Sequence, residues 1–593
     1  SSSAPSPEFP EMKPVAPTED NPCRPRHFKP ASCGAMPVDG PEKQSLEMSR
    51  SRLLITGLLF SLAFLAIGLR LAEVMLLKDG EPRLVRAHQR AHAQTVRADI
   101  VDRNGVLLAT TLDMPSLYAN PKQVIDAKQA ARQLTAVLPD LNREELLAKL
   151  TSDRSFVWIK RQLTPEQQFE VNKLGIPGLQ FETEHRRLYP KGSVTSHVVG
   201  FAGIDNKGLA GIERGLDDQL TTSDEPVQLS IDLRLQYILK DEIAKQIQTF
   251  GAEGGMGMIT DVNTGEILAM VSLPDFDPND PGTATPERLF NRATLGTYEM
   301  GSVFKIFNTA MALDDHVTTM SGGYDATNPI HVGRFTIHDD HAQRRWLSVP
   351  EIFMYSSNIG SAKMALDAGI ERQQDFLRKL GLLQTPTVEI REVGEPLVPR
   401  VWHQVNSMTI AYGHGLSVSP LQMVAAVGAV VDGGVMHRAT FLKRPDSERM
   451  GGTRVMSRQT SEEMRRLMRL VVEKGTGKFA AAPGYLVGGK TGTAEKVSGK
   501  GYARKELLSS FVGVFPINDP RYLIMVSVDE PHGVKSSAGY ATGGWVAAPA
   551  VSRIVQRMAP IMGIPPVDED SPEIRRALLV DYASSPGRKL AAD

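Results

Sequence analysis

A long stretch without a charged side chain, LLITGLLFSLAFLAIGL at residues 53–69, constrains this chain more than any other feature. As an α-helix it would extend about 26 Å, and continued to Leu77 it would span the roughly 30 Å core of a bilayer. Residues 1–52 are rich in proline and poor in large apolar side chains, so they suit neither a signal-peptide leader nor a globular core. We therefore predict a membrane anchor at 53–77 behind a disordered tail at 1–52.

Overall charge and cysteine content exclude two classes of function. The formal net charge is −1 over 593 residues, whereas a nucleic-acid-binding protein would have a basic excess, so no nucleic-acid partner is expected. The two cysteines, Cys23 and Cys33, both lie in the proline-rich tail. This excludes a disulfide framework and a thiolate metal cage in the rest of the chain. Basic residues flank the apolar stretch on both sides, so charge does not determine its orientation.

Patterning after the anchor predicts two folded domains and a second tail. Residues 78–225 mix short helical and strand patterns with turn signals, which indicates a mixed α/β N-terminal domain. Residues 226–566 have longer helical patterns and more apolar strands. Beyond Pro565-Pro566 the chain is polar again, so we expect a flexible C-terminal tail at 567–593.

The domain at 226–566 has strands at both ends and helices between them. A helix is expected after the N-cap Asp232, because apolar residues recur at helical spacing as far as Phe250. The turn Asn263-Thr264-Gly265 joins two apolar segments as a hairpin. The five expected strands are 256–262, 266–273, 486–496, 510–515 and 522–528. Helical patterns fill the interval from 304 to about 470, so we predict an α+β fold in which a five-stranded antiparallel sheet is covered by helices.

Three short motifs lie on these expected elements. They are Ser302-Val303-Phe304-Lys305, Ser356-Ser357-Asn358 and Lys490-Thr491-Gly492-Thr493. Each motif alone is a weak signal, and their order and placement give them weight. A serine hydroxyl needs a base to act as a nucleophile, and Lys305 lies one helical turn after Ser302. Lysine becomes such a base when desolvation or a neighbouring cation lowers its pKa, and Lys490 would provide that cation.

The other motif residues fit roles around the two lysines. Ser356 would relay a proton to the leaving group, and the amide of Asn358 would fix side-chain and substrate geometry. Gly492 would let a substrate backbone approach the strand, while Thr491 and Thr493 would offer hydroxyls to a carboxylate. The main-chain N–H groups of the first serine and of Thr493 would form an oxyanion hole. This chemistry requires no metal and no organic cofactor.

The three motifs resemble those of penicillin-binding proteins and class A β-lactamases. Further segments extend the resemblance from residue 53 to about 560 and resemble class B penicillin-binding proteins, which are membrane-anchored D,D-transpeptidases of bacterial cell-wall synthesis. These segments are 97–105 (RADIVDRNG), 187–192 (RLYPKG), 208–213 (GLAGIE), 346–350 (WLSVP) and 412–415 (YGHG). Glu299-Met300 stands where the elongation branch more often has two prolines, which favours the division-specific, septal branch. Met300 and Val303 depart from the proline and threonine that are frequent in the family.

The resemblance implies a fold, a reaction and a cellular setting. It implies a pedestal (dimerisation-type) domain at 78–225 and a transpeptidase domain at 226–566. Ser302 would attack the penultimate D-Ala of a stem pentapeptide and pass the acyl group to an amine of a second stem peptide, and β-lactams would acylate the same serine. The catalytic domain would lie in the periplasm, with the N-terminus cytoplasmic and the anchor in the inner membrane at the division site. The implied partners are stem peptides, a membrane-embedded SEDS-family glycosyltransferase (FtsW-type) and other division proteins.

Several alternatives stay open on the sequence. An elongation-specific transpeptidase would use the same chemistry in another complex, and a serine β-lactamase would need a group that activates a deacylating water. A catalytically inactive β-lactam sensor or division scaffold would keep the fold without turnover. The segment His338-Asp339-Asp340-His341 has metal-ligand types, but a polar loop beside the site is favoured because no further ligand cluster accompanies it. We expect Arg97, Asp102, Arg103 and Glu213 to brace the two domains as a buried ionic network.

Overall fold

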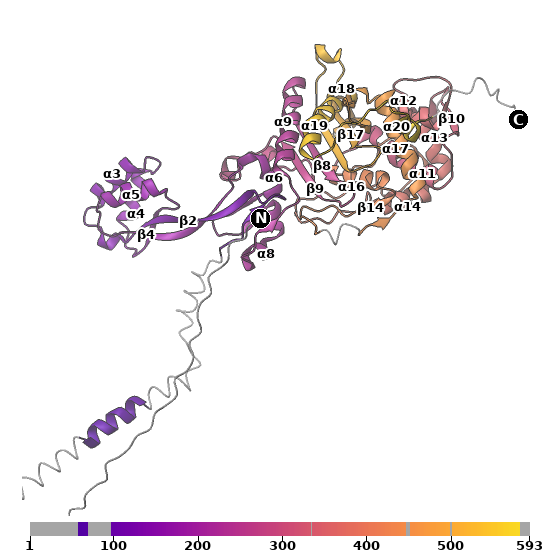
Figure 1. Ribbon diagram of the computed structural model, residues 1–593. Helices are drawn as coiled ribbons and strands as arrows, with labels where there is room; N and C mark the ends of the chain where they lie inside the picture. The colour runs from indigo at the N-terminus through magenta and orange to yellow at the C-terminus, as the bar shows by residue number, and fades with distance from the viewer. Residues whose placement is uncertain (1–56, 69–95, 334, 446–450, 499–500, 581–593) are drawn as a thin grey trace, which may run out of the picture. The chain divides into compact units, whose positions relative to one another are not determined.

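The computed structural model describes residues 57–68, 96–333, 335–445, 451–498 and 501–580. The chain divides into two compact units, Ser1–Ala93 and Gln94–Asp593. Of the first unit, residues 57–68 are described and are helical, drawn in indigo in Figure 1. Within the described ranges, no helix combines the length and the apolar character needed to cross a membrane. The predicted tail 1–52 with both cysteines, and most of the predicted anchor 53–77, lie outside the described residues.

A five-stranded antiparallel sheet lies at the centre of the C-terminal domain, which confirms the predicted α+β core. In spatial order its strands are β16 (Gly488–Ser498), β17 (Gly501–Phe515), β18 (Tyr522–Asp529), β8 (Gly254–Asp261) and β9 (Ile267–Leu273). Every residue of β18 is buried, and its apolar sequence is typical of a strand covered on both faces. Because β16 is an edge strand of this sheet, only one of its two long edges pairs with another strand of the sheet.

Helices cover both faces of this sheet (Figure 1). The helices of this domain are α9 (Leu233–Phe250), α10 (Pro286–Leu289), α11 (Lys305–Asp314), α12 (Val349–Tyr355), α13 (Asn358–Ala368), α14 (Ile370–Lys379), α15 (Gln404–Ile410), α16 (Pro420–Val431), α17 (Arg458–Glu473), α18 (Gly543–Val546), α19 (Ala548–Ile561) and α20 (Pro572–Leu578). On one face, α9 and α19 share an apolar cluster with the strands, and α16 and α17 cover the other. As predicted, α9 begins after Asp232, whose carboxylate accepts the Arg234 N–H.

Two expectations for this domain differ from the structure. Short antiparallel strand pairs lie among the helices of the interval 304–470. Strands of two or three residues are too short to show an alternating pattern in a sequence. These pairs are β10 (Gly323–Asp325) with β13 (Trp346–Ser348), β11 (Ile330–Val332) with β12 (Phe335–Ile337), and β14 (Val435–Met436) with β15 (Thr453–Arg454). Within the expected flexible tail, α20 forms after the N-cap Ser571, and its residues Ile574 and Leu578 pack onto the core. Residues 581–593 lie outside the described residues.

The N-terminal domain combines strands and helices, as the mixed pattern predicts. Its elements are β1 (Ile100–Val101), β2 (Leu107–Ala119), α3 (Ala127–Val137), α4 (Arg143–Leu150), β3 (Val157–Lys160), α5 (Pro165–Lys173), β4 (Leu179–Leu188), α6 (Ser196–Val199), β5 (Phe201–Ala202), β6 (Gly208–Ala210), α7 (Gly211–Gly215), α8 (Asp217–Thr222) and β7 (Val227–Gln228). The sheet order is β3-β2-β1-β7, and the long strand β4 pairs with β2 (Figure 1). Helices α3, α4 and α5 share a separate apolar cluster with β2 and β3.

A buried ionic network holds the N-terminal domain together. The carboxylate of Glu213 contacts both Arg97 and Arg187, the latter at 2.6 Å, and Arg97 also lies 2.6 Å from Asp217. The side chains of Arg97 and Glu213 have no exposed surface. Because a buried charge without a partner is costly, these contacts must form together.

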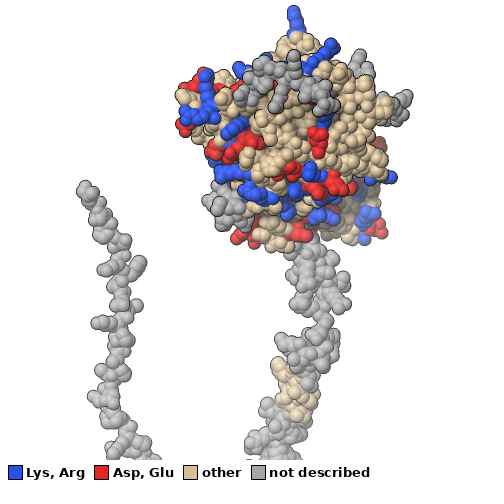
Figure 2. All heavy atoms as spheres, turned by 90° about the vertical axis from the view of Figure 1, so that its right-hand side faces the viewer, with Lys and Arg blue, Asp and Glu red and all other residues tan. Residues whose placement is uncertain are grey.

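Other members of the predicted network connect the two domains instead. The carboxylate of Asp102 accepts the Leu233 N–H at the start of α9 at 3.2 Å, and Arg103 lies 3.6 Å from Glu266 beside β9. The prediction of a brace between the domains is therefore confirmed for Asp102 and Arg103. On the outer surface, charged side chains of both signs lie next to one another over the face in Figure 2, consistent with the net charge of −1.

Candidate active site

Ser302 lies in a 3₁₀ turn, Gly301–Phe304, directly before α11. In the sequence Gly301 indicates a helix start, and in the structure the 3₁₀ turn continues directly into the first α-helical residue, Lys305. Gly301 has φ +53°, and a Cβ at this position would lie 2.5 Å from the carbonyl oxygen of Thr493 on β16. Glycine is therefore required here both by the backbone angle and by the approach of the third motif.

The amine of Lys305 joins the first two motifs. This side chain is fully buried, and its Nζ lies 2.7 Å from Ser302 Oγ, 3.2 Å from Ser356 Oγ and 2.7 Å from Asn358 Oδ1. Desolvation lowers the pKa of Lys305 to about 7, although the nearby carboxylates of residues 340 and 339 act in the opposite direction. A lysine with this pKa is available as a base near neutral pH.

Ser356 connects the second motif to the third. It is the C-cap of α12 and has left-handed backbone angles, φ +61° and ψ +43°, which are unfavourable for a residue other than glycine. Its Oγ lies 3.0 Å from Lys490 Nζ as well as near Lys305. The strained turn therefore places one hydroxyl between two lysines.

Lys490 is the second fully buried lysine and projects from β16. Its Nζ also lies 3.3 Å from the carbonyl oxygen of Thr491. Burial, and then the neighbouring charge of Lys305, lower the pKa of Lys490 well below its usual value. Two buried amines that share a hydroxyl between them cannot both hold a positive charge at low cost, so protonation of one opposes protonation of the other.

The rest of the third motif makes contacts within the protein that the sequence does not show. A Cβ at Gly492 would lie 2.7 Å from the carbonyl oxygen of Met300, so glycine is needed for the approach of the serine turn, while the approach of a substrate backbone stays a prediction. Thr491 is 7% exposed, and its Oγ1 bonds Thr476 Oγ1 at 2.7 Å. Thr493 Oγ1 accepts the Gly543 N–H at 3.1 Å. Both hydroxyls thus have partners within the protein, which periodicity and motif matching could not show.

Asp339 is a site residue whose role the sequence analysis missed. Its carboxylate accepts Ser357 Oγ–H at 2.8 Å and the Ile359 N–H at 2.9 Å, at the start of α13. The amide of Asn358 donates to the His338 carbonyl oxygen at 3.0 Å, which leaves Oδ1 directed at Lys305. The predicted polar loop therefore fixes the second motif. The described part of the chain contains no group of three or more His, Cys, Asp or Glu placed to hold a metal ion.

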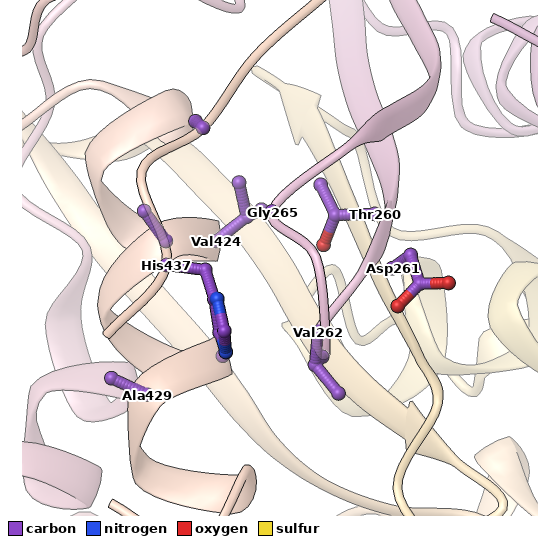
Figure 3. A pocket seen from close by; sticks show the side chains of 10 residues that line it. Thr260, Asp261, Val262, Gly265, Val424, Ala429 and His437 are labelled. Carbon is purple, nitrogen blue, oxygen red and sulfur yellow. The ribbon is translucent and has the colours of Figure 1, made fainter. Parts of the chain in front are cut away.

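A small cavity elsewhere in the domain is separate from this site (Figure 3). Its volume is about 20 Å³, enough for one water molecule, and it lies between the β8–β9 turn and α16. His437 lines it and bonds Asp432 through Nε2 at 2.9 Å, while Nδ1 has no hydrogen-bond partner in the described structure. The motif residues lie outside its lining.

The fold and the three motifs that it brings together are those of the class that includes penicillin-binding proteins and class A β-lactamases. Two family models match the chain: the penicillin-binding protein transpeptidase domain over residues 255–556, and the penicillin-binding protein dimerisation domain over residues 92–248. The chain belongs to the penicillin-binding protein transpeptidase family.

Known relatives cover most of the chain. It is 42% identical to the probable peptidoglycan D,D-transpeptidase FtsI of Caulobacter vibrioides, over 83% of this chain and 84% of the relative. It is 30% identical to the peptidoglycan D,D-transpeptidase FtsI of Escherichia coli K12, over 87% of this chain and 92% of the relative. Among solved structures, penicillin-binding protein 3 of Mycobacterium tuberculosis complexed with aztreonam matches with a TM-score of 0.64 at 25% identity, covering 80% of this chain and 98% of that one.

Proposed function

We propose that this chain is a serine D,D-transpeptidase that cross-links the stem peptides of peptidoglycan during cell division. The observation that carries the proposal is the position of Lys305 Nζ, 2.7 Å from Ser302 Oγ and 3.2 Å from Ser356 Oγ, with Lys490 Nζ a further 3.0 Å from Ser356 Oγ. The relatives named FtsI and the family structure with bound aztreonam support the same reaction class.

The hydrogen-bond capacity of the site fits two distributions of protons, because a cationic Lys305 would donate to all three neighbouring oxygens, and the reaction requires the distribution in which Lys305 is neutral. A neutral amine has one lone pair and two N–H groups, so neutral Lys305 accepts the hydroxyl hydrogen of Ser302 and donates to Ser356 Oγ and Asn358 Oδ1. A cationic Lys490 donates to the second lone pair of Ser356 Oγ. The hydroxyl hydrogen of Ser356 is then directed to a leaving group. In this state Lys305 is the general base.

The reaction proceeds in two acyl transfers. Ser302 Oγ attacks the carbonyl carbon of the penultimate D-Ala while its proton passes to Lys305 Nζ. The main-chain N–H groups of Ser302 and Thr493 stabilise the developing oxyanion. The peptide C–N bond then breaks, the proton passes through Ser356 to the leaving nitrogen, and D-Ala departs. An amine of a second stem peptide attacks the ester, forms the cross-link and returns a proton to Ser302 Oγ.

The strand residues Thr491, Gly492 and Thr493 bind the substrate along β16 in this proposal. Their support is the position of Gly492 directly against the serine turn. A β-lactam would enter the same place, and its strained amide would acylate Ser302. The contacts of the two threonine hydroxyls with Thr476 and Gly543 would orient them for a carboxylate.

The cellular setting belongs to the same proposal. The uncharged stretch at 53–69 supports a single-pass anchor at 53–77 in the inner membrane, and the extracytoplasmic substrate requires a periplasmic catalytic domain and a cytoplasmic N-terminus. The FtsI names of the relatives support a place at the division site, beside a SEDS-family glycosyltransferase of the FtsW type.

Labelling with a fluorescent penicillin tests the reaction. We expect the full chain to take up one label per molecule, slowly reversed, and Ser302→Ala to take up none. Ser321→Ala changes an exposed serine and should label as the parent does. Undiminished labelling of Ser302→Ala would overturn the assignment, whereas rapid penicillin hydrolysis would indicate a β-lactamase.

Depletion in the host cell tests the role in division. Filamentous cells with blocked septa are expected, and rescue should require Ser302. Round cells would indicate the elongation-specific transpeptidase instead. Rescue by Ser302→Ala would indicate a catalytically inactive scaffold or sensor.

A further inference from the structure

The loop that follows α15 runs antiparallel to the segment before Ser302. The Tyr298 N–H donates to the Val418 carbonyl oxygen at 2.9 Å, and the Val418 N–H donates back at 3.0 Å. At the other end, the Gly301 N–H donates to the Gly413 carbonyl oxygen at 3.3 Å. Residues 413–418 therefore lie alongside residues 298–301, which lead directly into the reactive serine.

The two backbones approach so closely that a side chain would not fit between them. Gly413 has φ +90°, and a Cβ at this position would lie 2.0 Å from the carbonyl oxygen of Gly301. Gly301 in turn meets the Thr493 carbonyl oxygen on its other side. A displacement of the loop 412–415 would therefore be transmitted to the serine turn without a flexible side chain to absorb it.

A carboxylate links the two segments between these main-chain contacts. Glu299 Oε1 accepts the Gly415 N–H at 2.8 Å, and Glu299 Oε2 lies 3.0 Å from His414 Nδ1. The carboxylate is an acceptor, so Nδ1 carries the proton and donates. The Glu299 side chain is 10% exposed and that of His414 27% exposed, so the pair is shielded from water for most of its surface. Such charge-assisted hydrogen bonds hold geometry more firmly than neutral ones.

The same loop also reaches the general base. The Tyr412 ring lies 5.4 Å from the His414 ring, and Lys305 Nζ lies 5.9 Å from the centre of the Tyr412 ring. Burial, and then the charge of Glu299, raise the pKa of Tyr412 to about 12, so its phenol is neutral near neutral pH. Loop 412–415 thus touches the serine turn on one side and the amine on the other.

We propose that Glu299 and His414 are positioning residues, which together clamp loop 412–415 against the serine turn and so set the orientation of Ser302 toward Lys305. The proposal rests on the proposed function, because its measure is acylation of Ser302. Neither residue contacts Ser302 or Lys305 through a hydrogen bond that the structure shows, and both act through the loop. Loss of the clamp should slow the chemical step and leave the initial binding of a β-lactam unchanged.

The geometry offers a matched pair of substitutions at residue 414. The amide nitrogen of asparagine can occupy the place of the imidazole Nδ1, so His414→Asn keeps a donor for Glu299. The amide of glutamine reaches the place of Nε2, so His414→Gln is also polar but presents its donor elsewhere. A role in packing alone would not distinguish these two variants, whereas a directed hydrogen bond would.

The test is stopped-flow acylation of the full chain by a fluorescent penicillin, which separates the dissociation constant of the first complex from the acylation rate constant. We expect His414→Ala, His414→Gln and Glu299→Ala to lower the rate constant about tenfold or more, since small misplacements of reacting atoms have effects of this size. His414→Asn should restore it to within about threefold of the parent, because it restores the donor. The dissociation constant should stay near that of the parent in all four variants, and the rate constants should not follow the melting temperatures.

Three outcomes would overturn the clamp. The first is an unchanged acylation rate constant in His414→Ala. The second is equal rescue by asparagine and glutamine, and the third is a loss of rate that follows the melting temperature across the variants. If the parent chain is not acylated at all, the proposed function fails and the clamp fails with it, whereas an acylated parent with an unaffected His414→Ala overturns the clamp alone.

Discussion

Replacing Lys490 with methionine tests which of the two buried lysines holds the proton. Lys305 Nζ and Lys490 Nζ lie 3.2 and 3.0 Å from the same atom, Ser356 Oγ. The two nitrogens are therefore at most about 6 Å apart, where two unit charges repel by about 2.7 kcal/mol at an effective dielectric constant of about 20. That energy corresponds to about 2 pKa units.

The sign of the effect follows from the role of Lys305. Its pKa is lowered to about 7, and only the neutral amine accepts the proton of Ser302. Acylation should therefore be fastest above this pKa and fall as the pH drops through it. In the proposed state Lys490 carries the positive charge, so its removal makes the ammonium form of Lys305 less unfavourable and is expected to raise the pKa of Lys305 by up to about 2 units. At pH 7 acylation should then fall about fiftyfold, and most of it should return near pH 10.

The assay is the acylation rate by a fluorescent penicillin between pH 5.5 and 10. Asp340→Asn is a control of opposite sign, because the exposed carboxylate of Asp340 raises the pKa of Lys305 and its removal should move the acid limb slightly downward. An acid limb of Lys490→Met that stays at the parental pH, with a lower plateau alone, would refute the reasoning. Lys490 would then act through substrate contact and not as the cation.

Substitutions at three further positions test other parts of the structure. Ser356→Gly should be more stable than Ser356→Ala by about 1 kcal/mol in thermal unfolding, because glycine accepts the left-handed angles, while both variants lose most acylation. Asp339→Asn should lower the free energy of unfolding by about 1–3 kcal/mol, because the asparagine side chain has one acceptor oxygen for two donor groups. A variant as stable as the parent would argue against these hydrogen bonds. Glu213→Gln should cost about 3–5 kcal/mol in denaturant unfolding, because it leaves Arg187 buried without a countercharge and leaves Arg97 with Asp217 alone. A loss below about 1 kcal/mol would show that water reaches this network.

The parts of the fold that the sequence predicts correctly are those determined by local patterns. The helix after Asp232 depends on its N-cap and on the helical spacing of its apolar residues, and the hairpin at Asn263-Thr264-Gly265 depends on its turn residues. All of these signals lie close together in the sequence. Strand β18 is mostly apolar and is buried along its whole length, because helices cover both faces of the sheet. Short strands and the helix at 572–578 depend on distant contacts, and for that reason local patterns do not show them.

The same distinction between local patterns and distant contacts applies to the residues of the site. The motif residues could be named from the sequence because the three motifs, in this order, resemble those of penicillin-binding proteins and fit the chemistry of a serine, a base and a second cation. Asp339 could not, because it caps a helix that begins 19 residues later, and no local pattern connects an aspartate to such a helix. Glu299 and His414 are separated by more than a hundred positions and meet only because two loops run side by side.

Two glycines of the site have contacts in the structure that differ from the roles their sequence positions suggest. From the sequence, Gly492 suggests room for a substrate, and Gly301 suggests the start of a helix. In the structure both are points where two backbones meet: Gly492 against Met300, and Gly301 against Thr493. Contacts between backbones have no rotamers with which to adjust, so they fix the serine turn more rigidly than side-chain packing would. A site that must hold a hydroxyl against a buried amine before substrate arrives gains from this rigidity, because misplacement of the reacting atoms by about 1 Å is enough to slow the reaction about a hundredfold.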